Sequence, residues 1–431
     1  MHIESGIENA AGTINCFGMN NNVTEMFDVA VVGGGPAGLS AAIALSVAGL
    51  NTALIARRSP YSDNRTTALL GTSVDFLESL DVWPRCRDSA AALQVMRLVD
   101  DTGRLIRAPE VKFSASEIEL DAFGYNIENR LLVGALEERA AELPALRRLD
   151  DEAESVIPEE AAVNIGTGNG ASLSARLVVG ADGRHSLCRE AARIEVSKRE
   201  LAQAALTFNV SHSRPHRNIS TEFHTPTGPC VFVPLPGERC SVVWVMSPKE
   251  AERLMALSDA ELSAVAEKQA HSILGRMTIA DGRHQFPLAI ERPRQYARDR
   301  VALVGEAAHV IPPIGAQGLN MGLRDAADIA EIAGKAVAAG EDPGARDVLR
   351  RYNSIRRPDV LSRTFAIDLA NSSLLSDFLP VQSLRAAGLH LIGSFGPLRR
   401  LAMREGLAPS WRAWPRANVT EPEETSADRS R

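Results

Sequence analysis

The sequence predicts an α/β protein with two folded domains and a C-terminal helical region. Three observations favour this class. Near the N-terminus, a buried β-branched run ends in a glycine cluster and continues into an alanine-rich helix. Runs of the same apolar texture return at 176–183 and 300–309, and the segment between them alternates apolar with polar residues. The first domain is therefore expected to be built from discontinuous segments that flank a second domain.

The first domain begins with a predicted strand–helix–strand unit. Residues 27–33 (FDVAVVG) predict a buried strand, residues 39–50 a helix and residues 51–56 (NTALIA) a second buried strand. This unit has the length that a parallel crossover needs. A further helix is predicted over 129–143 and a further buried strand over 176–183. These elements are typical of a Rossmann-like sheet.

The remaining elements follow from a change of texture. Runs such as LTFNVSH and CSVVWVMS, within about 201–287, predict an antiparallel sheet in a second α+β domain. Residues 300–309 return to the buried-strand pattern, and a proline-containing loop leads from them into a helix predicted over 319–339. After about residue 347 the chain is expected to be helical.

Composition excludes several classes of protein. The 431 residues carry a net charge of -7, so no basic footprint for nucleic acid is present. The cysteines lie far apart and show no metal-ligand spacing, which predicts a reducing compartment and no metal site. They are Cys16, Cys86, Cys188, Cys230 and Cys240. The first 25 residues contain acids but no Lys or Arg, so they do not resemble a signal peptide. A cytoplasmic location is expected, and either Met1 or Met26 could be the first residue.

The glycine cluster carries the clearest chemical signal. In GGGPAG, residues Gly33, Gly35 and Gly38 match G-x-G-x-x-G between a strand and a helix. Such glycines let the backbone approach a pyrophosphate at a helix N-terminus, where N–H groups and the helix dipole favour negative charge. A tight structural turn is the alternative, and the strand–helix–strand context favours dinucleotide binding.

One part of this fingerprint departs from the usual pattern. An acid that binds the adenosine ribose is expected at the end of the second strand, but Ala56 stands there and Arg57 and Arg58 follow. Either an arginine accommodates the 2′-phosphate of NADP, or the dinucleotide is FAD and is held by other contacts. The fingerprint alone leaves both open.

Three motifs together resemble a known family. The fingerprint, VVGADGRHSLCR (178–189) and RVALVGEAAHVIPPIGAQGLNMGLRDA (300–326) resemble the signature motifs of FAD-dependent aromatic hydroxylases of the para-hydroxybenzoate hydroxylase fold. Together with the long third motif, DNRTTALL (63–70) is most similar to the ubiquinone-biosynthesis hydroxylases. The resemblance covers about 27–407 and implies a Rossmann-like FAD-binding domain built from discontinuous segments, a substrate domain and a C-terminal helical region.

The resemblance also implies a division of the chain. The FAD-binding domain is expected over 26–80, 125–195 and 288–345, and the substrate domain over 81–124 and 196–287. The C-terminal helical region is expected over 346–415. An N-terminal extension, 1–25, and a tail, 416–431, are expected to be disordered.

The resemblance further implies which residues hold FAD. The glycines of the fingerprint would hold the pyrophosphate, and Arg65 and Arg130 would lie near the phosphates, the ribitol or the flavin, unless they form surface ion pairs. Asp182 and Gly183 would touch both FAD and a nicotinamide donor, and the segment from Gly305 to Asn320 would hold the ribityl chain and the flavin ring. The expected cofactor-binding residues are Gly33, Gly35, Pro36, Ala37, Gly38, Arg57, Arg65, Arg130, Asp182, Gly183, Gly305, Glu306, Pro313, Gly315, Gly318, Leu319 and Asn320. Glu306 replaces the usual aspartate, which puts one ribityl hydrogen bond in doubt.

Two histidines and the C-terminal segment have competing interpretations. His224 is a candidate for handling a phenolic proton, although an ordinary strand histidine is the favoured interpretation. His309 is interpreted as a loop histidine with hydrogen-bond partners in the protein rather than as a catalytic base.

Within 374–404, Leu384, Leu389, Ile392 and Phe395 alternate with Arg385, Arg399, Arg400 and Arg404. Core helices are favoured there over a membrane-surface or partner contact.

The resemblance implies a FAD-dependent monooxygenase that hydroxylates an aromatic ring through a C4a-hydroperoxyflavin. The expected substrate is a prenylated lipid, a polyprenyl phenol of ubiquinone biosynthesis. O2 is the co-substrate, and the electron donor is NADH, NADPH or a redox partner. A ubiquinone-biosynthesis complex, or a peripheral contact at the inner face of the membrane, is compatible with such a substrate. Two alternatives stay open: a hydroxylase of a small soluble aromatic, and a non-catalytic flavin-binding subunit of a biosynthetic complex.

Overall fold

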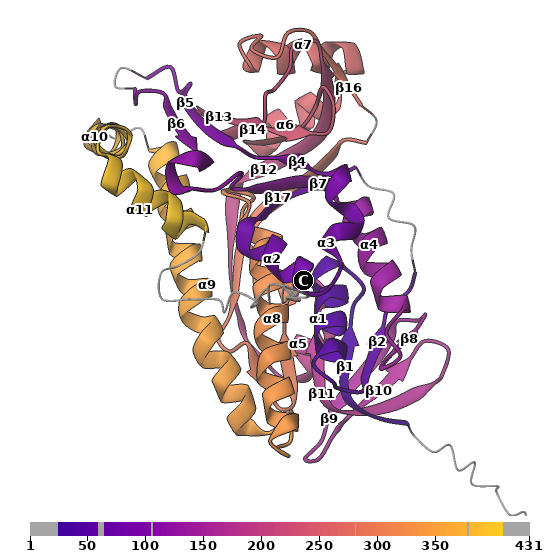
Figure 1. Cartoon of the computed structure of the whole chain (residues 1–431). Helices are drawn as coiled ribbons and strands as arrows, with labels where there is room; N and C mark the ends of the chain where they lie inside the picture. The colour runs from indigo at the N-terminus through magenta and orange to yellow at the C-terminus, as the bar shows by residue number, and fades with distance from the viewer. Residues whose placement is uncertain (1–24, 59–63, 105–106, 281, 377–378, 408–431) are drawn as a thin grey trace, which may run out of the picture.

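The computed structural model describes residues 25–58, 64–104, 107–280, 282–376 and 379–407. The predicted disordered ends, apart from Glu25, lie outside these residues, as do 408–415 of the predicted helical region. The described chain contains two large sheets, a small third sheet and a bundle of helices (Figure 1). The predicted α/β class is confirmed.

The first large sheet is the Rossmann-like sheet that the sequence predicts. Its strand order is β18-β19-β11-β1-β2-β8, with β10 and β9 added beside β11, and the central pairs β19-β11-β1-β2-β8 are parallel. The strands are β1 (Glu25–Val32), β2 (Thr52–Ile55), β8 (Leu146–Leu149), β9 (Ala153–Pro158), β10 (Val163–Thr167), β11 (Ser172–Gly180), β18 (Ala297–Arg298) and β19 (Val301–Leu303). Segments from both sides of the second domain therefore share one sheet.

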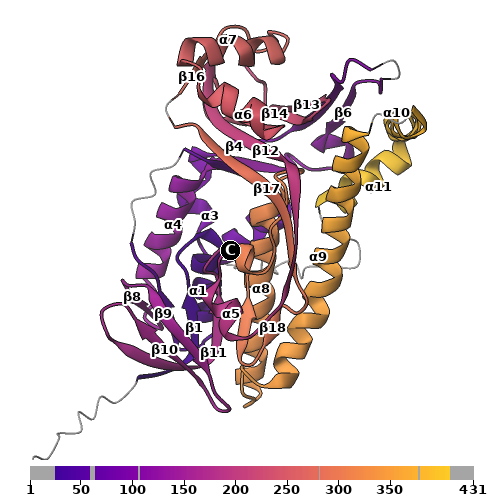
Figure 2. The ribbon, with the colours of Figure 1, turned by 180° about the vertical axis from the view of Figure 1, so that it is seen from behind.

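Helices pack against this sheet and bury its apolar residues. Helix α1 lies between α4 and α8, and α9 runs alongside α8 (Figures 1 and 2). The helices of this region are α1 (Pro36–Val47), α4 (Asn129–Ala141), α5 (Leu187–Ala191), α8 (Gln317–Ala338) and α9 (Arg346–Leu375), with a 3-10 turn η3 (Gly305–Ala307). The predicted helices over 39–50, 129–143 and 319–339 are thus present, with ends shifted by a few residues.

The glycine cluster fixes how α1 meets the sheet. Gly33 has φ +113°, and a Cβ there would lie 2.3 Å from the Ala181 carbonyl oxygen. A Cβ at Gly38 would lie 2.1 Å from the Gly33 carbonyl oxygen. Only glycine fits at these two positions, because any side chain would push α1 away from β1 and β11.

The second large sheet differs in one respect from the prediction. Its order is β16-β12-β15-β14-β13-β5-β6, with β17 beside β12. All its pairs are antiparallel except β5 with β13, so the sheet is mixed. The strands are β5 (Val95–Asp100), β6 (Val111–Ser114), β12 (Val196–His212), β13 (Ile219–Thr225), β14 (Gly228–Leu235), β15 (Arg239–Met246), β16 (Met277–Ile279) and β17 (His284–Pro293). The parallel pair arises because β5 comes from a segment far upstream of β13, and two such strands need no hairpin.

Short elements connect the two large sheets and cover the second. A three-stranded sheet of order β3-β7-β4 lies between them, and α6 and α7 cover the outer face of the second sheet (Figure 1). These elements are β3 (Thr66–Leu70), β4 (Ala91–Ala92), β7 (Gly124–Glu128), α2 (Gly71–Ser79), α3 (Trp83–Cys86), η1 (Arg87–Ser89), η2 (Ala115–Ile118), α6 (Pro248–Met255) and α7 (Asp259–Gln269). Strands β7 and β17 run across the predicted boundaries at 124 and 287, and Trp83, from the predicted substrate domain, belongs to the core of the first sheet. The division into domains stays a prediction.

The last helices correct the favoured interpretation of 374–404. Helices α10 (Leu379–Ser394) and α11 (Gly396–Leu407) lie beside the upper end of α9 and against β6 and η2 (Figures 1 and 2). Leu384 is 75% exposed and Phe395 is 55% exposed, whereas Leu389 and Ile392 are half-buried. The core prediction is therefore wrong for Leu384 on α10 and for Phe395 between the two helices, because this segment packs on the protein through only one side. Within the described ranges, no helix is both long and apolar enough to cross a membrane.

Candidate cofactor and substrate cavity

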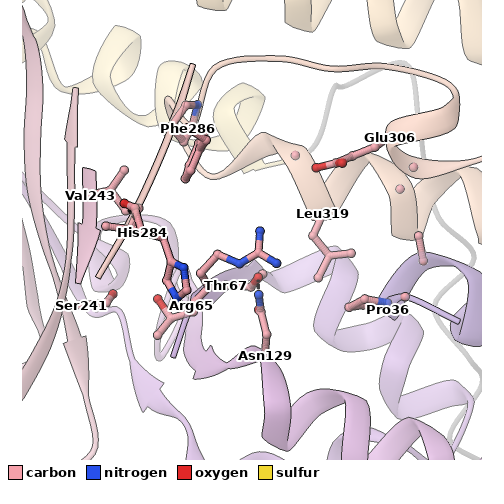
Figure 3. A pocket seen from close by; sticks show the side chains of 18 of the residues that line it. Pro36, Arg65, Thr67, Asn129, Ser241, Val243, His284, Phe286, Glu306 and Leu319 are labelled. Carbon is pink, nitrogen blue, oxygen red and sulfur yellow. Dashed lines mark hydrogen bonds between the residues drawn. The ribbon is translucent and has the colours of Figure 1, made fainter. Parts of the chain in front are cut away.

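A cavity of about 400 Å³ lies between the first sheet and the second. One wall comes from the glycine-rich turns that precede α1 and α8, and the opposite wall comes from the second sheet (Figure 3). Arg65 and Thr67 of the β3 region and Asn129 of α4 lie between the walls. Ligand pockets of α/β proteins form at this place, outside the carboxyl ends of the parallel strands.

The glycine wall leaves room for a group to lie against the backbone. Gly35 is the N-cap residue of α1, so no side chain caps the first backbone N–H groups of this helix. A Cβ added at Gly35 would have no neighbour within 4 Å. Gly318 has the same open surroundings in the first turn of α8. Two helix N-termini therefore face the cavity, and their backbone N–H groups and dipoles favour a negatively charged ligand.

The structure brings together most of the residues that the family resemblance predicted. Those that line the cavity are Gly35, Pro36, Ala37, Gly38, Arg65, Gly183, Gly305, Glu306, Pro313, Gly318 and Leu319. They come from segments up to 284 residues apart, from Gly35 to Leu319. Glu306 is exposed and lines the cavity (Figure 3).

Two predicted residues do not line the cavity because their side chains build the turns around it. The Asp182 carboxylate accepts hydrogen bonds from the Ser186 hydroxyl (2.6 Å) and the Cys188 backbone N–H (3.0 Å), which fixes the turn before α5. Asn320 is buried; its Oδ1 accepts from the Leu70 N–H at 2.9 Å, and its Nδ2 donates to the Ala68 carbonyl at 2.8 Å. Both side chains therefore have structural partners within the protein. Gly33 and Gly315 likewise belong to turns beside the cavity, both with positive φ.

Two predicted arginines also lie outside the cavity lining. Arg130 is exposed and pairs with Glu128 at 2.7 Å, which fits its alternative interpretation as an ion pair. Burial raises the pKa of Glu128, but hydrogen bonds and charge from Arg239 and Arg130 outweigh this, so the pKa is lowered overall. Arg57 is exposed and lies 3.6 Å from a Glu152 carboxylate oxygen. Ala56, the residue before Arg57, packs closely against Gly34. A Cβ added at Gly34 would lie 2.7 Å from the Cβ of Ala56.

The two histidines singled out in the sequence have protein partners. His224 lies on β13 with its Nε2 3.1 Å from Glu222, and it is not among the cavity-lining residues. This placement does not support the proposed handling of a phenolic proton. His309 is buried, and its Nε2 lies 2.7 Å from Asp325. It therefore matches the interpretation as a satisfied loop histidine.

The second wall is one face of the second sheet. Thr207 of β12 pairs with Val243 of β15 on one side and with His284 of β17 on the other, so these three residues form a row across the sheet. Asn209 pairs with Ser241 two residues along, and the same face continues there. The opposite face carries Phe208 and Val242, which pack in the core with α6 and α7. The wall is thus part apolar and part polar.

Sequence reasoning missed the residues of this second wall and several others around the cavity. The lining residues that it missed are Asn64, Thr66, Thr67, Asn129, Ala181, Thr207, Phe208, Asn209, Ser241, Val242, Val243, Gly282, His284, Phe286, Val304 and Gly322. The alternation in LTFNVSH marks Thr207 and Asn209 as facing away from the core, which is a usable signal. No local pattern marks His284.

A buried ion cluster supports the glycine wall from behind. Asp325 accepts a hydrogen bond from the Gly305 N–H at 2.9 Å and pairs with His309, while Arg356 contacts Asp325 at 2.5 Å. Arg356 also pairs with Asp328 at 3.0 Å and Asp359 at 2.7 Å. Burial raises the pKa of Asp325, but the charges of Arg356 and His309 outweigh it and lower the pKa overall. The cluster ties α8 and α9 to the η3 turn that lines the cavity.

The cavity fits a dinucleotide that carries a flavin. The open Gly35 end offers backbone donors and no Cβ to obstruct a pyrophosphate, and the Gly318 end offers a second helix N-terminus. The fold and the cavity thus define an α/β protein that binds a nucleotide cofactor beside a mixed, sheet-built substrate wall.

Comparison with known proteins identifies the class. Residues 26–362 match the family described as FAD binding domain. The chain is 32% identical over 396 residues to the ubiquinone hydroxylase UbiL of Rhodospirillum rubrum, with 90% of this chain and 91% of that protein covered. It is 31% identical over 413 residues to the 3-demethoxyubiquinol 3-hydroxylase of Escherichia coli, with 90% and 100% covered. The chain belongs to the FAD-binding domain family, which confirms the predicted resemblance and the predicted cofactor, FAD.

Solved structures agree on the fold. The crystal structure of the p-nitrophenol 4-monooxygenase PnpA from Pseudomonas putida has a TM-score of 0.73 and 23% identity, covering 90% of this chain and 100% of that one. PqsL from Pseudomonas aeruginosa, in complex with 2-aminobenzoylacetate, has a TM-score of 0.70 and 22% identity, with 85% and 100% covered. These likenesses describe the shared architecture.

Proposed function

We propose that this protein is a FAD-dependent monooxygenase that hydroxylates the aromatic ring of a polyprenyl phenol in ubiquinone biosynthesis. The observation that carries the proposal is the cavity itself, in which two helix N-termini, each with an open glycine, face a wall that is part apolar and part polar. Relatives named as ubiquinone hydroxylases support the choice of substrate class. NADH, NADPH or a redox partner would supply the electrons.

The residues have separate tasks in this proposal. Gly35 and the N-terminus of α1 hold the pyrophosphate of FAD, and Gly318 with the N-terminus of α8 holds the flavin end. Arg65 points into the cavity between these ends and adds positive charge there (Figure 3). When bound, FAD supplies the activation of O2 that oxygen transfer to a ring requires. Val243, Phe286 and Leu319 exclude water and hold the aromatic ring in position.

A quinone profile tests the proposed pathway. Cells that lack this gene and any redundant hydroxylase are grown aerobically, and their isoprenoid quinones and precursors are measured by mass spectrometry. We expect a precursor that lacks one ring oxygen to accumulate, and its structure names the ring position. Restoring the intact gene is the control. An unchanged profile would contradict the ubiquinone assignment and leave a small soluble aromatic as the substrate.

We also propose that α10 and α11 rest on the surface of an anionic membrane. Leu384 and Leu391 are exposed and lie seven residues apart on one face of α10, and the exposed Phe395 follows the helix directly, four residues after Leu391. Arg400 and Arg404 are exposed on α11, and 379–407 carries four arginines and one glutamate in a chain of net charge -7. Apolar side chains next to positive charge fit the interface of an acidic bilayer, where a polyprenyl substrate dissolves.

Vesicle flotation tests this surface. The doubly substituted Leu391→Ser, Phe395→Ser protein is expected to bind vesicles containing phosphatidylglycerol at least tenfold more weakly than the native protein, because it loses two inserted apolar groups. Ile157→Ser, which changes an equally exposed side chain on β9, is the matched control. Equal binding of the native and doubly substituted proteins, or apolar self-association in place of vesicle binding, would contradict the membrane proposal.

A further inference from the structure

The end of β2 lacks the acid that usually binds the adenosine ribose of a dinucleotide. Such an acid accepts hydrogen bonds from the ribose hydroxyl groups. Ala56 stands at this position and is buried against the glycine turn. A methyl side chain offers no hydrogen-bond partner, so another group has to hold the ribose of a bound FAD.

An arginine from the neighbouring strand reaches this place. Arg148 of β8 is in register with Leu54 of β2, two residues before Ala56. Its Nη2 donates to the Ala56 carbonyl at 3.1 Å and lies 3.9 Å from the Cβ position of Gly34. Glu137 of α4 pairs with Nη1 and so fixes the guanidinium. The Arg148 side chain is 11% exposed, so it is held firmly and still reaches the surface beside the glycine turn.

The acids that follow β8 already have partners near the same end of the sheet. A Glu152 carboxylate oxygen lies 3.6 Å from Arg57, and the Asp150 carboxylate accepts a hydrogen bond from the Arg58 backbone N–H at 2.6 Å. Arg57 and Arg58 are both exposed. The end of β2 thus presents Arg57, Arg58 and Arg148 where the usual pattern has an acid.

We propose that Arg148 holds the adenosine ribose of FAD by donating a hydrogen bond to a ribose hydroxyl oxygen. This rests on the placement of the FAD pyrophosphate at the N-terminus of α1, and it does not depend on the aromatic substrate. A site built on an arginine also accepts a 2′-phosphate on the ribose, which an acid would repel. Arg148 therefore determines which adenosine nucleotides this end of the site binds.

Two probes that differ only in the 2′-phosphate measure this preference. ADP-ribose and 2′-phospho-ADP-ribose are titrated by calorimetry into the full-length protein after removal of FAD. We expect the phosphorylated probe to bind at least fivefold more tightly, because its phosphate meets a guanidinium instead of a carboxylate. The measurement needs neither flavin nor turnover.

Two substitutions test whether Arg148 sets the preference. Arg148→Met removes the guanidinium, so the two probes are expected to bind within twofold of each other and FAD about tenfold more weakly. Ala56→Glu restores the usual acid and keeps Arg148, so it should reverse the preference in favour of ADP-ribose. Thermal unfolding shows whether each variant is folded, and Ala56→Glu carries the test if Arg148→Met is not.

Arg147→Met is the matched control. Arg147 is the adjacent residue of β8, so its side chain points to the opposite face of the sheet, where it is 58% exposed and pairs with Glu25. This variant should keep the native preference and the native affinity for FAD.

The outcomes distinguish this inference from the proposed function. If the native protein binds FAD but shows a smaller or opposite preference between the probes, or if Arg148→Met keeps the native preference, the role of Arg148 is wrong and the proposed function stands. If the native protein binds neither probe and does not take up FAD, the cofactor site fails, and the proposed function fails with it. Loss of the preference in Arg148→Met and its reversal in Ala56→Glu support the inference.

Discussion

Gly35→Val is expected to abolish the retention of FAD while the protein still folds. Gly35 has φ -71° and ψ 173°, an extended conformation that any residue adopts, and its Cβ position has no neighbour within 4 Å. The valine methyl groups would therefore enter the cavity in front of α1, where we place the pyrophosphate. We expect the dissociation constant for FAD to rise by about a hundredfold or more, equivalent to roughly 3 kcal/mol. Flavin fluorescence during titration of the apoprotein measures this change.

Two other glycines provide the controls for this experiment. Gly134→Ala, on the exposed side of α4, should leave FAD binding unchanged, because a Cβ there meets nothing within 4 Å. Gly33→Ala should reduce the free energy of unfolding even without FAD, because its Cβ would clash with the Ala181 carbonyl at a positive φ. Retention of a full complement of FAD by Gly35→Val would show that the pyrophosphate does not lie at the N-terminus of α1.

The first sheet could be predicted because its signals are local. A buried strand in a parallel sheet is a continuous apolar run, and the strands near 27–33, 51–56 and 176–183 each show one. The glycines at 33 and 38 mark a turn in which no other residue fits, so they fix the position of α1 as well. The order of the three motifs then predicted residues of the glycine wall of the cavity, including Gly183 and Gly318.

The second wall could not be predicted because it depends on strand register. His284, Thr207 and Val243 meet only through the pairing of β17 with β12 and of β12 with β15. A shift of one residue would turn each side chain to the opposite face, and no local pattern specifies that pairing. The ion pair of Arg130 with Glu128 differs, because its partners lie only two residues apart and the sequence analysis left a surface ion pair open as the alternative.

The exposed face of α10 illustrates a different limit. Helical spacing of apolar residues predicts that one face is buried, but it does not say against what. The structure buries Met403 and leaves Leu384 and Phe395 in contact with solvent. Periodicity therefore detected the amphipathic pattern correctly, whereas the assignment to a core was wrong for Leu384 and Phe395.

Arg356→Met is expected to lower the free energy of unfolding by about 3–5 kcal/mol at pH 7. Arg356 is fully buried and pairs with three carboxylates, those of Asp325, Asp328 and Asp359. Methionine fills similar space but leaves these carboxylates buried without their main cation. Because Asp325 also holds the Gly305 N–H, the η3 turn should loosen, and FAD should bind more weakly.

The loss of unfolding free energy caused by Arg356→Met should depend on pH in a defined direction. In the native protein the pKa of Asp325 lies below its usual value, since the charges of Arg356 and His309 outweigh burial. A lowered native pKa stabilises the fold above the pKa of the unfolded chain, and this contribution is lost as pH falls through the native pKa. Without Arg356, the effect of burial on the carboxyl pKa values dominates and favours their protonated forms. Lowering the pH therefore protonates the buried carboxylates of the variant and reduces its loss of stability. The difference in stability is therefore largest near pH 7 and shrinks as the pH falls toward 4 and below.

Urea unfolding of the apoproteins at pH 7 and at pH 4.5 measures this difference. Arg350→Met is the matched control, because it removes an arginine from the same helix whose side chain is 70% exposed and pairs only at the surface with Asp347. That exposed ion pair should contribute less than about 1 kcal/mol at either pH. If Arg356→Met loses no more unfolding free energy than Arg350→Met, or if its loss grows as the pH falls, other cations compensate the buried carboxylates. The link from α9 through Asp325 to the cavity would then have to be abandoned.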